Sequence, residues 1–249
     1  MRTGAPLMIR HALWAVVLAS LAVAACSKPA DKAQVSREQV LAYLDDHPEA
    51  INEASQRYEL KRRRELMAES AKAIALRRAA LERDPRDFVA NPNGKVTVVE
   101  FFDYRCPYCK ASLPAIQALI LQNPDIRFVF KEFPIIPDAD GKVGLSLRAS
   151  EAALAAARAG KYQSVHDAMM ALSPLDDDAI AKALRDNGLD PATTVASADD
   201  LHHIKDVRDL AFAIGAHGTP AFVVGDTLIE GNSMDQLALA IEQAKRSKG

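Results

Sequence analysis

Two cysteines separated by two residues carry the clearest chemistry in this sequence. Cys106 and Cys109 enclose Pro107 and Tyr108, and they stand where a strand-like run ends and a helix-like run begins. Proline suits the first position of a helix, so Cys106 is expected at a helix N-terminus, where free N–H groups and the helix dipole favour a thiolate. Cys109 is near enough to close a disulfide. The pair is therefore suited to thiol–disulfide exchange, in which one sulfur attacks and the other resolves.

Metal binding and a purely structural disulfide are the alternatives for this pair. A structural zinc site normally has four ligands, but the only other cysteine is Cys26, and no histidine lies at ligand spacing to the pair. A structural disulfide that closes so short a loop removes little chain entropy and stabilises little. We therefore expect no metal and no cofactor. Copper(I) held by the two reduced thiolates stays open as an alternative, because these are soft ligands.

The N-terminus has the features of an export signal. Residues 1–25 combine a positive start with an apolar stretch that is too short to span a bilayer comfortably. Residues 23–26 resemble a bacterial lipobox, which would make Cys26 the lipid attachment site; ordinary cleavage within residues 22–24 is the alternative. Lipidation would also leave the Cys-x-x-Cys pair as the only thiols. The chain is therefore expected in the periplasm, anchored through Cys26 to a bacterial membrane.

Composition excludes few function classes. The net charge of −2 and the pI of about 6.3 give no reason to expect a nucleic-acid partner. Residues 26–35 have the composition of a short tether. An apolar content of 49% is sufficient for a packed core.

Residues 36–84 are predicted to form an N-terminal helical segment. Ser36 and Gln39 form a capping-box pattern that opens a short helix, and Pro48 can begin the next. From there to about Arg83 no glycine or proline occurs, which predicts one helix of roughly 35 residues, about 50 Å long.

One apolar line runs along this predicted helix. Leu60, Met67, Ile74 and Leu81 recur at seven-residue spacing, but arginine fills most positions that would complete a coiled-coil seam. The segment therefore either packs against the domain that follows or forms a homo-oligomer through residues 36–84. The sequence favours the homo-oligomer, because the line has no other evident partner.

Residues 88–249 are predicted to be the catalytic domain. Two buried strands with a helix between them form a β-α-β unit, followed by helices, a hairpin and a closing helix. This order is that of an α/β thioredoxin fold with an all-helical insertion, preceded here by the N-terminal helical segment. The strands are expected at 96–102, 126–133, 221–225 and 227–230, and the helices at 145–187, 199–214 and 234–246.

Two motifs resemble those of a known family. The run at residues 100–109 and the run at residues 218–220 together resemble the DsbA-like thiol:disulfide oxidoreductases of the bacterial periplasm. The resemblance covers roughly residues 88–246. Residues 38–49 are similar to the N-terminal segment of the ScsC-like (suppressor of copper sensitivity) subgroup, some of whose members oligomerise through it. The resemblance implies cysteine-containing exported proteins as partners, with a membrane redox partner that resets the site.

The resemblance also implies roles for single residues. Pro220 would be the cis-proline beside the active sulfur, and Thr219 would offer its backbone to a substrate chain. Glu100 would be a buried acid that relays protons for Cys109, with Lys131 as its ion-pair partner. The alternative is that both charges lie at the sheet edge in solvent.

Several other polar residues have simpler interpretations. Asp103 and Tyr104 are expected to shape the active-site loop. His217 lies close to Pro220 in the sequence and would lower the pKa of Cys106 if it approached that thiol, although an exposed loop position is favoured. His202 and His203 are expected on a helix surface, and residues 176–178 to cap a helix N-terminus.

The sequence is compatible with more than one redox function. With Cys106 as an exposed nucleophile and Cys109 as the buried resolving thiol, the chain would act as a disulfide isomerase or reductase, or as a DsbA-type dithiol oxidase. Tyr108 has no cationic form to stabilise a thiolate, and a threonine before Pro220 resembles the isomerases, so isomerase or reductase is favoured. Copper tolerance and a scaffold function stay open. The export signal and the helical insertion argue against a glutaredoxin, another class of protein with a similar motif.

Overall fold

The computed structural model describes residues 35–248, which divide into two compact units with their boundary between Glu59 and Leu60. The predicted signal, the lipobox cysteine Cys26 and all but the last residue of the predicted tether lie outside the described residues. Among residues 35–248, no helix has both the length and the apolar character needed to cross a membrane.

The N-terminal helices begin where the sequence predicts and end earlier. Helix α2 (Arg37–Asp46) starts with the expected capping box, formed by Ser36 with Gln39. Helix α3 (Glu49–Leu76) follows, and then α4 (Arg78–Glu82). The single helix expected up to Arg83 is therefore wrong: Arg77 leaves the helical conformation, with φ −113° and ψ 13°, and its N–H bonds to Ile74 instead. This turn redirects the chain so that α4 lies against the sheet.

Five strands form one mixed sheet in the order β1-β3-β2-β4-β5. They are β1 (Phe88–Ala90), β2 (Val96–Phe102), β3 (Ile126–Glu132), β4 (Ala221–Val224) and β5 (Thr227–Glu230). Among the strands of residues 35–248, only β2 and β3 pair in parallel, joined by helix α5 (Pro107–Gln122), as the β-α-β prediction requires. The sequence does not predict the edge strand β1, because three residues are too few to show a period.

The two faces of the sheet carry separate cores. Alternate side chains of a strand point to opposite faces, so Val98 and Phe102 of β2 pack on the side of Cys109, whereas Val99 and Phe101 pack on the other. Helix α5 and helix α10 (Met234–Lys248) lie on the first side. The second is covered by Ile74, α4 and helix α9 (Ala198–Ala213).

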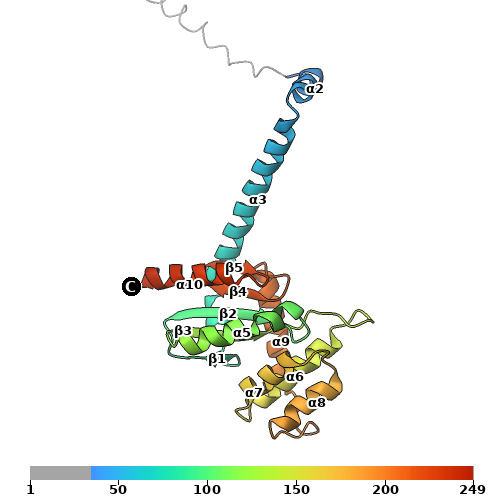
Figure 1. Ribbon diagram of the computed structural model, residues 1–249, viewed down its shortest axis with the longest axis vertical. Coiled ribbons are helices and arrows are strands. Elements are labelled where there is room, and N and C mark those ends of the chain that lie inside the picture. The colour runs from blue at the N-terminus through green and yellow to red at the C-terminus, as the bar shows by residue number, and fades with distance from the viewer. Residues whose placement is uncertain (1–34, 249) are drawn as a thin grey trace, which may run out of the picture. The chain divides into compact units, whose positions relative to one another are not determined.

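Three helices form the all-helical insertion. They are α6 (Gly144–Ala157), α7 (Tyr162–Ala171) and α8 (Asp177–Asp186), which pack on one another below the sheet in Figure 1. Alanines of α6 lie in the core and permit close packing. Asp176 caps α8 by accepting from the Ala179 N–H at 2.8 Å, as expected. The architecture is the expected thioredoxin fold with an insertion.

A buried cluster of charges lies on the second face. Lys131 Nζ pairs with Asp87 Oδ2 at 2.5 Å and donates to the Ala80 carbonyl at 2.7 Å. His203 Nε2 stands 3.0 Å from Asp87 Oδ1. The prediction of a helix-surface position is therefore wrong for His203, which is only 2% exposed, because α9 turns it toward the chain segment that joins α4 to β1.

Candidate active site

Cys106 occupies the position that its sequence context predicts. It is the N-cap residue of α5, with Pro107 at the start of the helix, and both cysteines are free thiols. The expectation of an exposed nucleophile is wrong, since Cys106 is 4% exposed and Cys109 1%. The exposed fractions of the two thiols are therefore nearly equal and do not show which of them is the nucleophile. The exposed members of the motif are Pro107 and Tyr108, and Tyr108 is 63% exposed.

The fold brings the second motif against the first. The Thr219–Pro220 peptide bond is cis. Cys106 Sγ, when protonated, donates to the Thr219 carbonyl oxygen at 3.1 Å, across 113 positions of sequence. The Pro220 carbonyl accepts from the Gly231 N–H at 2.8 Å, which ties the loop to the residue after β5. The two motifs that carry the family resemblance thus form a single site.

Electrostatics distinguish the two thiols. Hydrogen bonding from the Cys109 thiol, assisted by Thr219 and by the backbone N–H groups of Cys109 and Tyr108, lowers the pKa of Cys106 to about 6, against a smaller opposing effect of burial. Burial raises the pKa of Cys109 far above its ordinary value, and its hydrogen bond to Cys106 and the charge of Glu100 act in the same direction. At neutral pH, Cys106 is therefore the thiolate and Cys109 the thiol.

Glu100 lies on the side of the sheet that carries the cysteines. It is 3% exposed, and burial, with a contribution from the charge of Cys106, raises its pKa to about 8. The expected partner Lys131 is on the opposite face, because the register pairs Glu100 with Phe130 and Lys131 with Phe101. The prediction of a Glu100–Lys131 pair is therefore wrong. Glu100 is a neutral acid at pH 7 in the reduced protein.

His217 takes the exposed loop position that the sequence favours. Its ring stacks on Phe212, with 5.7 Å between ring centroids, and it is not among the main groups that shift the pKa of Cys106. Helix-terminal N–H groups and the neighbouring thiol lower that pKa instead.

Sequence reasoning missed a buried polar network beside the site. Glu132 Oε1 accepts from Tyr104 Oη at 3.0 Å and from Tyr162 Oη at 2.7 Å. Tyr104 Oη also lies 3.1 Å from His166 Nδ1. All four side chains are at most 2% exposed. In the sequence, only Glu132, an acid within the apolar run of β3, could have indicated this network. Its partners come from distant segments of the chain.

Asp103 fastens the loop before the cysteines. Its carboxylate accepts from the backbone N–H groups of Arg105, Ile135 and Ile136, at 2.8 to 3.0 Å, and from Ser146 Oγ at 2.9 Å. The side chain is fully buried. These bonds give Asp103 the loop-shaping position that the sequence predicts.

Comparison with known proteins identifies the family. Residues 97–242 match the family described as the DSBA-like thioredoxin domain. The chain belongs to the DsbA-like thioredoxin family. The arrangement of the site, with a Cys106 thiolate beside a protonated Cys109 and a cis-proline loop against it, agrees with this membership.

Three solved structures are similar to the chain over most of their own length, and one of them is a ScsC protein, which supports the resemblance to the ScsC-like subgroup. A thioredoxin-like oxidoreductase from Silicibacter pomeroyi is 37% identical over 68% of this chain and 98% of its own, with a TM-score of 0.63. A linker-deletion mutant of Proteus mirabilis ScsC is 28% identical over 90% of this chain and 99% of its own, with a TM-score of 0.65. BcfH of Salmonella enterica Typhimurium is 28% identical over 94% of this chain and 99% of its own, with a TM-score of 0.67.

The curated relatives are much longer proteins. The Na(+)/H(+) antiporter NhaA 3 of Salinispora tropica is 34% identical over 148 residues, which are 57% of this chain and 22% of the antiporter. The NhaA 1 antiporter of Salinispora arenicola is 32% identical over 175 residues, 65% of this chain and 25% of the antiporter. The chain thus spans about a quarter of the length of these relatives.

Among residues 35–248, no group of three or more histidine, cysteine, aspartate or glutamate side chains is arranged to hold a metal ion.

Proposed function

We propose that this chain is a periplasmic disulfide isomerase or reductase that acts on cysteine-containing exported proteins. The observation that carries the proposal is the contrast between the two thiols: Cys106 has a pKa of about 6, whereas the pKa of Cys109 is strongly raised. A thiolate attacks disulfides, whereas a protonated thiol does not.

The first step is attack by the Cys106 thiolate on a substrate disulfide. The substrate S–S bond breaks, a mixed disulfide forms, and the departing substrate sulfur leaves as a thiolate. In an isomerisation, that thiolate or another in the substrate attacks in turn, and Cys106 is released without net oxidation. The Thr219 carbonyl, 3.1 Å from Cys106 Sγ, is near enough to hold the substrate backbone beside the reacting sulfur.

The second route is resolution by Cys109, which gives reduction. Cys109 must lose its proton before it attacks the mixed disulfide. Once Cys106 is in that disulfide, its negative charge no longer adds to the effect of burial on Glu100, so the pKa of Glu100 falls. Glu100 then releases its own proton to solvent, and the carboxylate so formed accepts the proton of Cys109. The chain is then oxidised to the Cys106–Cys109 disulfide, and a membrane redox partner must return two electrons.

The high pKa of Cys109 favours isomerisation over reduction. Resolution waits for deprotonation of a buried thiol, and this delay gives the substrate time to rearrange. Thr219 before Pro220 and the uncharged Tyr108 support the same direction. Dithiol oxidation by a disulfide form of the site, as in a DsbA-type oxidase, is the alternative.

We also propose that residues 36–84 form a homo-oligomer. The predicted apolar line divides in two: Ile74 and Leu81 are buried within their own chain, whereas Leu60 and Met67 are 53% and 59% exposed. The exposed pair is free to pack against another copy. Sedimentation of a Leu60→Glu/Met67→Glu variant tests this proposal, because loss of the oligomer is expected without loss of the redox site.

Periplasmic location and a lipid on Cys26 complete the proposal. The support is the sequence of residues 1–26 and a structural relative from Salmonella enterica serovar Typhimurium whose description calls it periplasmic. Metabolic labelling with a fatty acid, compared with a Cys26→Ala variant, tests the anchor.

Reactivation of scrambled ribonuclease by the reduced protein tests the activity. Strong reactivation that Cys106→Ser abolishes and Cys109→Ser largely retains would support an isomerase. Loss of activity in both variants would indicate cycles of reduction and reoxidation. Absence of reactivation, with fast oxidation of reduced ribonuclease by the disulfide form, would make the chain an oxidase.

Copper(I) binding is a second candidate, supported by the two free thiols of one Cys-x-x-Cys motif. Titration of the reduced protein with copper(I) against a competing chelator tests it. Affinity no greater than that of a short Cys-x-x-Cys peptide would remove this function.

A further inference from the structure

Helix α7 of the insertion contacts the chain on the N-terminal flank of the redox motif. Tyr104 stands two residues before Cys106, and its hydroxyl lies 3.1 Å from His166 Nδ1 on α7. The same hydroxyl donates to Glu132, which also accepts from Tyr162, the first residue of α7. His166 of α7 therefore contacts the segment that leads into the motif directly, and Tyr162 is joined to it through Glu132.

The hydrogen bonds of this flank run in a fixed direction. Burial lowers the pKa of His166 to about 3, so the imidazole is neutral. The Tyr104 hydroxyl donates its one hydrogen to Glu132, so it acts as the acceptor in its hydrogen bond with His166. The neutral imidazole therefore carries its hydrogen on Nδ1. Because Tyr104 and His166 are buried, removal of the Tyr104 hydroxyl would leave a buried donor without a partner.

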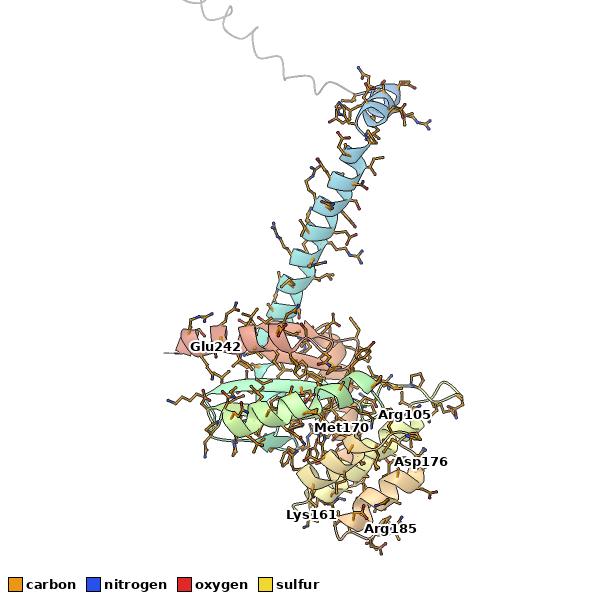
Figure 2. All side chains as sticks on the ribbon, in the orientation of Figure 1. Arg105, Lys161, Met170, Asp176, Arg185 and Glu242 are labelled. Carbon is orange, nitrogen blue, oxygen red and sulfur yellow. The ribbon has the colours of Figure 1, made fainter. Side chains whose placement is uncertain are left out.

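The C-terminal end of α7 contacts the other flank. Lys110 follows Cys109 directly, and its Nζ donates to the carbonyls of Met169 at 3.1 Å, Met170 at 3.2 Å and Leu172 at 2.6 Å. The last carbonyls of a helix lack partners within the helix and favour a cation. Figure 2 labels Met170, one of these acceptors, and Arg105, which adjoins Tyr104 on the opposite flank.

We propose that α7 brackets the redox motif, with Tyr104 and Lys110 as positioning residues that hold Cys106 Sγ against the N-terminal N–H groups of α5. The inference rests on the proposed function, in which the Cys106 thiolate is the attacking group. It assigns to the helical insertion a part in setting the reactivity of the site.

The consequence for Cys106 follows from its surroundings. The N–H groups of Tyr108 and Cys109 stabilise its thiolate only while the sulfur stays near them. The Lys110 ammonium also interacts favourably with both sulfurs, whereas Glu100 on β2 opposes the thiolate when it is ionised. Loosening either flank is therefore expected to raise the pKa of Cys106 and to make its disulfide harder to reduce.

Three variants test the bracket in the purified protein. Lys110→Met removes the C-terminal contact, Tyr104→Phe removes the N-terminal one, and Lys110→Arg retains a cation with several donors. Exposed residues supply the matched controls Lys161→Met, at the start of α7, and Tyr58→Phe, on α3. Ultraviolet absorbance of the thiolate against pH gives the pKa of Cys106, the equilibrium with glutathione gives the redox balance, and thermal unfolding is recorded for each variant.

Both contact-breaking variants are expected to raise the pKa of Cys106 by about half a unit to one unit, which lowers the thiolate fraction about threefold to tenfold below that pKa. The glutathione equilibrium should shift toward the protein disulfide by a similar factor. Lys110→Arg and both control variants should remain near the wild-type values.

The bracket is overturned if the two variants lower only the unfolding temperature and leave the pKa and the glutathione equilibrium unchanged. A shift confined to one of them also overturns it, because charge or local packing alone would then account for the effect. Neither readout uses a protein substrate, so failure to reactivate ribonuclease would refute the proposed isomerase and leave this test intact.

Discussion

Glu100→Gln is expected to make the protein more stable, and increasingly so as the pH rises. Burial raises the pKa of Glu100 from 4.5 to about 8. The folded state therefore holds a proton that the unfolded state has lost between these two values, so stability falls as the pH rises through this window. Glutamine is neutral at every pH and removes the penalty.

The size of the effect follows from the two pKa values. The penalty on folding is about 1 kcal/mol at pH 5, about 3 kcal/mol at pH 7 and about 5 kcal/mol at pH 9. The gap between variant and wild type should therefore widen by about 4 kcal/mol from pH 5 to pH 9. Any constant effect of the amide on packing cancels in this comparison, and Glu132 titrates in both proteins.

Urea unfolding at the three pH values, with a reductant present, gives the measurement. The dithiol form is required because the Cys106 charge contributes to the raised pKa. Exposed Glu53 supplies the control, since Glu53→Gln should give a curve parallel to wild type. If the Glu100→Gln curve were also parallel, Glu100 would not be a neutral buried acid, and its assignment as proton acceptor for Cys109 would fail.

Three further predictions follow from single contacts. The rate of alkylation of the reduced protein should increase with pH, with a midpoint at about pH 6, and then level off, with Cys106 modified and Cys109 not. A midpoint near pH 8 would contradict the assignment of Cys106 as the nucleophile. Lys131→Met should lower the free energy of unfolding by about 3 to 5 kcal/mol because it leaves Asp87 buried without its cation, and a loss below about 1 kcal/mol would be the contrary result. Asp176→Ala should lower it by about 1 kcal/mol through loss of the α8 cap, with Asp176→Ser recovering most of the loss.

Local patterns were sufficient for much of the fold. The capping box at Ser36, the strand β2 and the position of Cys106 at the start of α5 all depend on neighbours within a few residues. The same holds for the order of strands and helices, which identifies the thioredoxin fold. The sequence does not show the break in the helix at Arg77, because packing against the sheet causes it and no helix-breaking residue marks it.

Local sequence patterns could not predict which residues pair with the buried charges. The sequence suggests Lys131 as the partner of Glu100 because the two residues lie on neighbouring strands, yet the strand register sends their side chains to opposite faces. A shift of one residue in register reverses the face of every side chain, and nothing within either strand specifies the register.

The sequence by itself determined which atoms are the candidates for the redox chemistry, because the spacing of Cys106 and Cys109 and the proline between them act through a single helix terminus. Only the tertiary structure decided how that chemistry is adjusted. The carbonyl of Thr219 and the carbonyls of α7 that hold Lys110 come from segments far along the chain. Their approach depends on packing of the whole domain, which no local pattern records.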